Sequence, residues 1–91
     1  MAVTLMVKIQ VENFDKWKKA YDDADEFRKK AGIVVKGIYQ LAEDDKSIIL
    51  ISDYPGIEMA KAMLKNPQWE ENQRKAGVIG GFETSFYNYV G

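Results

Sequence analysis

The chain has 91 residues, of which 46% are hydrophobic and 30% are charged, and its formal net charge at pH 7 is −1. A chain of this length and composition is expected to form one globular domain, residues 1–91. The charge balance provides no long-range attraction to nucleic acid or to an anionic membrane, so we expect neither as a partner.

The sequence contains no cysteine and no histidine. Disulfides, zinc–thiolate sites and thiol nucleophiles are therefore excluded, and so are a histidine-ligated haem and histidine acid–base chemistry. Proton transfer would need a carboxylate, a lysine or a tyrosine with a shifted pKa. We expect no cofactor and no metal site. The lack of cysteine also fits a cytoplasmic location.

Residues 3–12 alternate between apolar and mixed positions, which predicts a strand with one strongly apolar face. The apolar positions of this strand are Val3, Leu5, Val7, Ile9 and Val11. No basic region precedes this stretch and no cleavage site follows it, so we interpret it as a strand rather than a signal peptide. No apolar run approaches the ~20 residues of a membrane span.

Residues 14–31 are predicted to form one amphipathic helix, capped by Asn13 and ended by Gly32. Its apolar positions recur at spacings of three and four, which is the helical period. They are Phe14, Trp17, Ala20, Tyr21, Ala24, Phe27 and Ala31. Basic residues at 28–30 lie where the helix dipole favours cations.

A hairpin is predicted next, with strands at residues 33–42 and 47–54 and a polar turn at residues 43–46. The run from Ile48 to Ile51 is apolar on both faces, which places the second of these strands in the centre of the sheet.

A further helix is expected over residues 57–65. Asn66 and Pro67 then begin another, as cap and first helical residue, and Gly77 ends it.

The last strand is predicted to begin near residue 79, to turn at an elbow formed by Gly80 and Gly81, and to continue from Phe82 to Val90. The resulting β-α-β-β-α-β order, with right-handed crossovers, predicts an α+β ferredoxin-like fold: a four-stranded antiparallel sheet with the helices on one face. The other face would then expose Met6 and apolar residues of the third strand, so we expect a second copy of the chain to cover it.

Several segments resemble the small dimeric α+β barrel proteins of the antibiotic-biosynthesis-monooxygenase-like group. Residues 11–18 (VENFDKWK) and 27–32 (FRKKAG) resemble the end of their first strand and their first helix. Residues 57–67 (IEMAKAMLKNP) and 75–80 (KAGVIG) resemble their second helix with its proline break and the elbow before their last strand. The resemblance covers nearly the whole chain, and the order and spacing of these segments make it specific for the fold.

This resemblance implies a homodimer whose sheets pack face to face, with a small pocket in each subunit between helices and sheet. Members of the group include cofactor-independent monooxygenases, haem-degrading enzymes and isomerases. Related sequences often carry histidines at the positions of Ile9 and Ala24, and prolines at the elbow where this chain has Gly81. The two apolar residues exclude chemistry that depends on those histidines.

The candidate pocket residues are mostly aromatic. They are Ile9, Trp17, Tyr21, Ala24, Tyr39 and Trp69. An aromatic lining would hold a small apolar or aromatic ligand, and a hydroxyl or indole donor would orient its polar atom. The competing interpretation is that these side chains pack the core or the dimer interface. No catalytic residue is assigned.

Two other site classes are disfavoured by the sequence. The acidic residues at 43–45 lack the spacing of a calcium loop and are interpreted as a solvated turn. RNA-recognition domains share this element order, but they need aromatic residues on the central strands, and the predicted central strand carries the run from Ile48 to Ile51 instead.

Three hypotheses for function therefore stay open. The chain could be a homodimeric protein that binds a small apolar or aromatic molecule, or a cofactor-independent monooxygenase in which the substrate itself reduces oxygen. It could also be a structural or interaction dimer whose pockets are filled by side chains. An open cavity beside Tyr21 and Trp69 would favour the first two, and a filled one the third.

Overall fold

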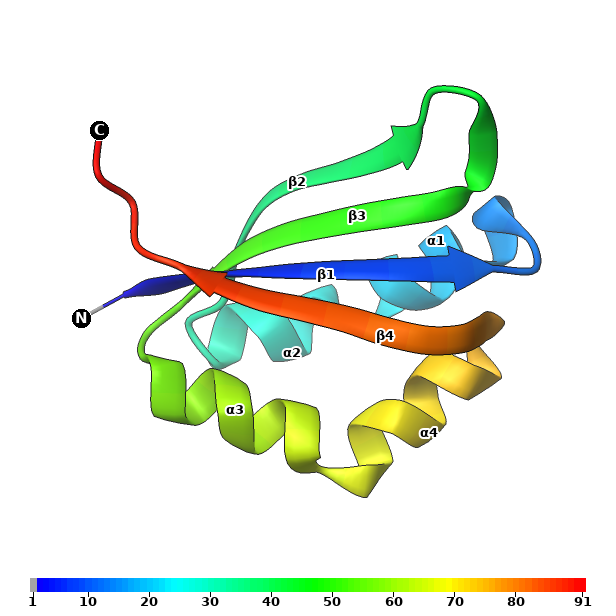
Figure 1. Cartoon of the computed structure of the whole chain (residues 1–91). Coiled ribbons are helices and arrows are strands. Elements are labelled where there is room, and N and C mark those ends of the chain that lie inside the picture. The colour runs from blue at the N-terminus through cyan, green and yellow to red at the C-terminus, as the bar shows by residue number, and fades with distance from the viewer. Residues whose placement is uncertain (1) are drawn as a thin grey trace.

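The computed structural model describes residues 2–91, and Figure 1 shows their arrangement. Four strands form one sheet, and each of the two crossovers contains a pair of helices. The elements are β1 (Val3–Val11), α1 (Phe14–Asp23), α2 (Asp25–Lys30), β2 (Val34–Leu41), β3 (Asp44–Tyr54), α3 (Ile57–Lys65), α4 (Pro67–Lys75) and β4 (Val78–Tyr87).

The strand order is β2-β3-β1-β4, and all neighbouring strands are antiparallel. The helices lie on one side of this sheet, so the predicted ferredoxin-like fold is confirmed (Figure 1). β3 has a neighbour on each side, as its doubly apolar run predicted, and β4 pairs with β1. In the part of the chain that the structure describes, no helix is long and apolar enough to cross a membrane.

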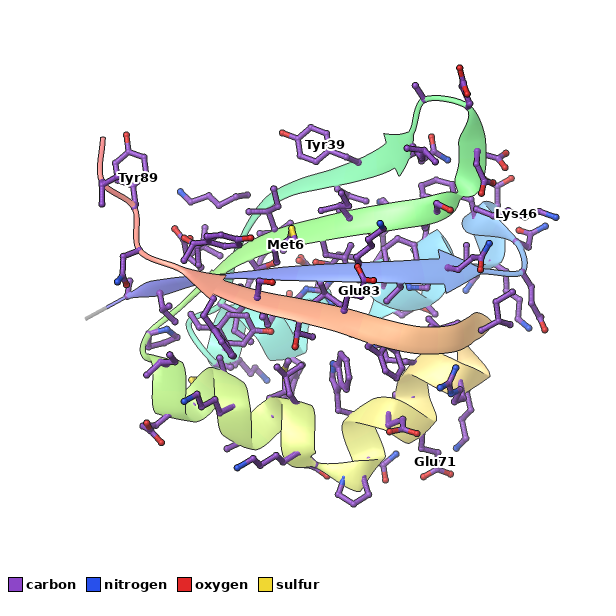
Figure 2. The ribbon with its side chains drawn as sticks, in the orientation of Figure 1. Met6, Tyr39, Lys46, Glu71, Glu83 and Tyr89 are labelled. Carbon is purple, nitrogen blue, oxygen red and sulfur yellow. The ribbon has the colours of Figure 1, made fainter. Side chains whose placement is uncertain are left out.

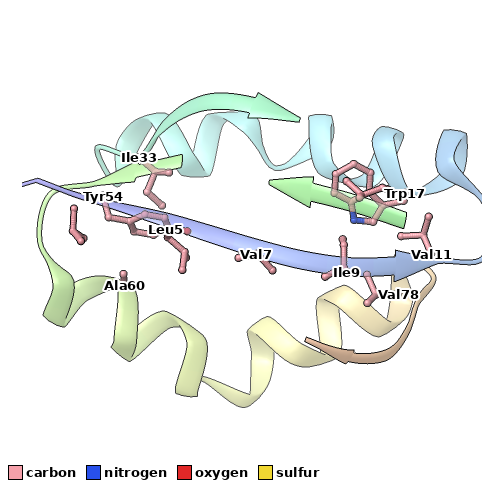
Figure 3. Close-up of a cluster of buried hydrophobic side chains, with 11 residues drawn as sticks. Leu5, Val7, Ile9, Val11, Trp17, Ile33, Tyr54, Ala60 and Val78 are labelled. Atoms are coloured by element: carbon pink, nitrogen blue, oxygen red, sulfur yellow. The ribbon is translucent and has the colours of Figure 1, made fainter. Parts of the chain in front are cut away.

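The core lies between the sheet and the helices. Directly opposed residues of antiparallel strands share a face, so the buried positions of β1 continue onto β3 through the pairs Leu5–Ser52 and Ile9–Ile48. Trp17 of α1 packs on this face and is 1% exposed. Figure 3 shows the buried hydrophobic side chains of the core along β1, with the α1–α2 pair on one side and the α3–α4 pair on the other.

The outer face of the sheet carries the alternate residues of the same strands. Met6 is opposite Ile51, and Ile49 is opposite Lys8 on one side and Tyr39 on the other. Figure 2 shows Met6 and Tyr39 on the strands, away from α3 and α4. This face has an apolar centre with charged residues such as Lys8 and Glu83 around it. Among residues 2–91, no helix covers it.

The first crossover differs from the single helix that we predicted over residues 14–31. The helix breaks at Ala24, whose φ of −92° and ψ of 8° interrupt the helical path. The carbonyl group of Tyr21, freed at this break, accepts hydrogen bonds from the Ala24 amide and from the Arg28 guanidinium. At this break, Arg28 of α2 lies over the end of α1, with its guanidinium on the Tyr21 ring.

Two further boundaries differ from the prediction. The hairpin turn consists of Ala42 and Glu43, and β3 already begins at Asp44, which pairs with Leu41 of β2. The Asp44 carboxylate accepts hydrogen bonds from the Lys46 amide and the Ser47 hydroxyl. These bonds lower the Asp44 pKa, the Ser47 hydroxyl most. At the other end of the chain, β4 ends at Tyr87, so residues 88–90 do not extend the last strand as predicted.

Candidate functional site

A cavity of about 180 Å³ lies between the inner face of the sheet and the helices. Its floor is formed by β1 and β3, and its walls by residues of all four helices. Most of the lining is apolar or aromatic, including Leu5, Val7, Trp17, Tyr21 and Trp69. The helix break at Ala24 lies at this cavity, so the same local feature that divides the first crossover also shapes the site.

Four of the predicted pocket residues line this cavity together: Trp17, Tyr21, Ala24 and Trp69. Ile9 does not line it. That side chain is 3% exposed and belongs to the core near Val78 (Figure 3). Tyr39 does not line it either, because its position in β2 places it on the outer face of the sheet, where it is 58% exposed.

Aromatic stacking organises one wall of the cavity. The ring centroids of Trp17 and Tyr21 are 5.0 Å apart with an interplanar angle of 27°. On the opposite side, Trp69 of α4 lies with its ring centroid 5.0 Å from that of Phe82 on β4. Each side of the cavity therefore has an aromatic ring that packs against a second ring, and both sides present apolar surface to a ligand.

Arg28 is a lining residue that our sequence reasoning missed. Its guanidinium carbon lies 3.6 Å from the centroid of the Tyr21 ring, and 13% of its side chain is exposed. One terminal nitrogen donates to the Tyr21 carbonyl, while Nε is buried without a hydrogen-bond partner. The sequence spacing could have indicated this position, because Arg28 follows Tyr21 by seven residues and Ala24 by four and so falls on the apolar stripe of the predicted helix.

The β3 side of the cavity contributes hydroxyl groups. The Tyr54 hydroxyl donates to the sulfur of Met63 over 3.2 Å, and Ser52 is buried beside it on the same strand. The pKa of Tyr54 is raised to about 12, mainly by burial and to a smaller extent by Tyr21, while Arg28 opposes the rise. The phenol therefore stays protonated at neutral pH and acts as a hydrogen-bond donor rather than as a base.

The remaining polar lining comes from Asn72 and Gln73 of α4. Among the described residues, no carboxylate lines the cavity and no cluster of acidic side chains could hold a metal ion. The Asn66 side chain is not part of this lining: it accepts a hydrogen bond from the Gln68 amide over 2.9 Å and so caps α4, as predicted. The cavity can therefore orient a ligand through donors and apolar contacts.

No protein-family model matches the sequence, and no curated protein matches it. Solved structures do match the fold over nearly its whole length. The cofactor-independent oxygenase SnoaB from Streptomyces nogalater superposes with a TM-score of 0.72 at 13% identity, covering 99% of this chain and 94% of that chain. An antibiotic biosynthesis monooxygenase structure gives a TM-score of 0.68 at 8% identity, covering 98% and 99%. The chain therefore shares the ferredoxin-like α+β fold of these proteins.

A conserved protein from Methanosarcina mazei Go1 shares this fold as well, with a TM-score of 0.71 at 16% identity over 96% of this chain and 91% of that chain. The resemblance drawn from the sequence is thus confirmed by the three-dimensional match. At these identities the match shows the fold alone, so chemistry has to be argued from the cavity of this chain.

Proposed function

We propose that this chain is a homodimeric, cytoplasmic protein that binds one small, largely apolar or aromatic molecule in the cavity of each subunit. The observation that carries this proposal is the open cavity beside Tyr21 and Trp69, lined mainly by apolar and aromatic side chains. A protein that used this space only for packing would fill it with side chains, since protein interiors are close-packed. The cavity therefore opposes the purely structural interpretation.

The volume limits the size of the ligand. An engineered apolar cavity of about 150 Å³ binds benzene, and drug-sized ligands occupy pockets of about 300–1,000 Å³. At about 180 Å³, the cavity of this chain suits a molecule with one or two rings. A tricyclic substrate would require the helices to move apart.

The homodimer is proposed from the outer face of the sheet. Its apolar centre contains Met6, Ile49 and Ile51, and a more open hollow of about 350 Å³ lies between this face and the C-terminal segment from Tyr87 to Gly91. A second sheet packed face to face would cover these residues in the manner that the resemblance to dimeric α+β barrels implies.

Native mass spectrometry of freshly purified protein tests both parts of this proposal. We expect a species of twice the 10.4 kDa chain mass that retains a small molecule or takes up 2-naphthoate or 2-naphthamide when either is added. Uptake should be lost in Trp69→Ala, because this substitution removes one wall of the cavity. A dimer that binds neither compound at millimolar concentration would contradict the binding function.

A second candidate function is cofactor-independent oxygenation, which the structural similarity to SnoaB favours. In such a reaction a substrate methylene group and O₂ give a carbonyl group and water, and the substrate supplies the electrons. The chain would contribute a dry cavity and hydrogen-bond donors such as the Tyr54 hydroxyl. Oxygen uptake with a one- or two-ring aromatic ketone that carries an activated methylene group, reduced in Trp69→Ala, would support this activity, and binding without oxygen uptake would exclude it for that compound.

A further inference from the structure

The cavity is mostly apolar, yet it contains a permanent positive charge. Arg28 lines it, and an arginine side chain stays protonated in proteins. Only 13% of this side chain is exposed, so water screens its charge weakly. Burying a charge is unfavourable unless a partner of opposite charge or a set of hydrogen bonds compensates for it.

The compensation that the described residues provide is incomplete. The nearest carboxylate oxygen, on Asp25, lies 4.0 Å from a terminal nitrogen of Arg28, and Asp25 itself is paired with Lys29 over 3.1 Å. The Tyr21 ring contributes a cation–π contact, and the Tyr21 carbonyl accepts one hydrogen bond. Nε is buried with no acceptor. The site therefore has one more positive charge and one more donor than its own side chains can satisfy.

We propose that Arg28 selects a ligand with a negatively charged oxygen, namely an aromatic carboxylate or a phenolate, over its neutral counterpart. This inference rests on the proposed binding function and specifies its ligand class. The rings of Trp17 and Trp69 would hold the aromatic ring of the ligand from opposite sides, while the guanidinium of Arg28 would donate to its charged oxygen. The Tyr54 hydroxyl, which donates to the Met63 sulfur in this structure, would turn from that weak acceptor to the oxygen as a second donor. The neutral Tyr54 hydroxyl adds a donor without adding a negative charge that would repel such a ligand.

A purely structural role for Arg28 explains part of this geometry. The hydrogen bond to Tyr21 closes the end of α1, and the stacked guanidinium packs against the ring. Arg74 makes the same two kinds of contact outside the cavity: it donates to the Val78 carbonyl over 3.2 Å and lies 4.9 Å from the Phe82 ring centroid. Arg74 is therefore a matched control, because it shares the structural role and does not line the cavity.

The test compares 2-naphthoate with 2-naphthamide, which have nearly the same shape and differ in charge. Dissociation constants are measured by isothermal titration calorimetry at neutral pH for the wild type, Arg28→Gln, Arg28→Lys and Arg74→Gln. In the wild type, we expect the carboxylate to bind about tenfold or more tightly than the amide, as hydrogen bonds to a charged group imply. The preference should fall below about threefold in Arg28→Gln and persist in Arg74→Gln.

Arg28→Lys retains the charge and keeps the test valid if Arg28→Gln does not fold, and it should keep part of the preference. Equal binding of the two compounds by the wild type would overturn the charge inference while leaving the binding function intact. An unchanged preference in Arg28→Gln would also overturn it. Failure of both compounds to bind the wild type would overturn the binding function and the inference together.

Discussion

At position 17 the indole ring is 1% exposed and stacks on Tyr21, so this residue belongs both to the core and to the cavity wall. Phe27 also lines the cavity but is 67% exposed, which places it at the solvent side. Trp17 should therefore contribute strongly to folding and Phe27 only weakly, although both line the cavity and both fall on the same predicted stripe of the first crossover.

Trp17→Ala is expected to lower the free energy of unfolding by about 3–5 kcal/mol, because it removes a fully buried aromatic side chain and leaves a cavity. Phe27→Ala should cost less than about 1 kcal/mol, since most of its surface is already in water. Urea denaturation followed by circular dichroism measures both values. Equal losses in the two variants would contradict the assignment of Trp17 to the core.

The raised pKa of Tyr54 predicts a pH dependence of stability. Burial raises this pKa from 10.0 to about 12, so the folded state holds the phenol proton more tightly than the unfolded chain does. The stabilising contribution is complete below pH 10 and is lost as the pH rises through about 12. Denaturation midpoints measured between pH 9 and pH 12 should fall less steeply in Tyr54→Phe. A steeper or identical slope would show that Tyr54 is not the group responsible.

At the level of elements, the beginning of β4 contains an irregularity in its pairing with β1, which the sequence indicated only as a glycine elbow. The pairing of β1 with β4 shifts register between Lys8 and Gln10, opposite the stretch that contains Gly80 and Gly81. Gly80 has φ of +71°, in the left-handed region, whereas Gly81 lies outside that region. The predicted elbow is therefore a bulge within the strand, and a single glycine provides its backbone conformation.

These adjacent glycines offer a controlled pair of substitutions, because a methyl group at either one would meet nothing within 4 Å. Gly80→Ala is expected to cost about 1–2 kcal/mol through left-handed backbone strain. Gly81→Ala should be neutral or stabilising by up to about 1 kcal/mol, since it reduces the entropy of the unfolded chain. Thermal unfolding of the two variants measures the difference, and the opposite order would refute the bulge assignment.

The sequence predicted elements better than it predicted contacts. The range 57–65 and the Asn66–Pro67 restart matched α3 and α4 because caps, proline and glycine act locally. The break at Ala24 was missed because no proline or glycine marks it in the sequence, and the Arg28 hydrogen bond that accompanies it joins residues two turns apart. Tyr39 was placed in the pocket by residue type, although strand alternation decides its face and puts it on the outer side of the sheet.

For the whole molecule, the element order and the rules for right-handed crossovers were sufficient to predict the ferredoxin-like topology. The volume of the cavity was not predictable, because it depends on how four helices approach one sheet. The lack of a hydrogen-bond partner for the buried Arg28 Nε was not predictable either, because it depends on every group packed around that atom. The ligand class is therefore an inference from structure, whereas the fold could be inferred from the sequence.

The proposed dimer is tested by a charge placed in the centre of the outer face. Ile51 is opposite Met6 on this face, so Ile51→Lys should convert the dimer to a monomer at micromolar concentration in sedimentation velocity experiments. Lys61→Glu, an exposed change on α3, is the control and should leave the dimer intact. Sedimentation of the wild-type protein as a monomer would contradict the proposed homodimer.

The central claim is that the cavity binds a small aromatic molecule, and the chain provides its own reporters. It contains two tryptophans, Trp17 and Trp69, and both line the cavity. In proton–nitrogen correlation spectra, the two indole N–H signals should shift in a saturable manner as 2-naphthoate or 2-naphthamide is added, with one shared dissociation constant. Stationary indole signals, with saturable shifts confined to residues of the outer face such as Met6 and Tyr39, would contradict the account.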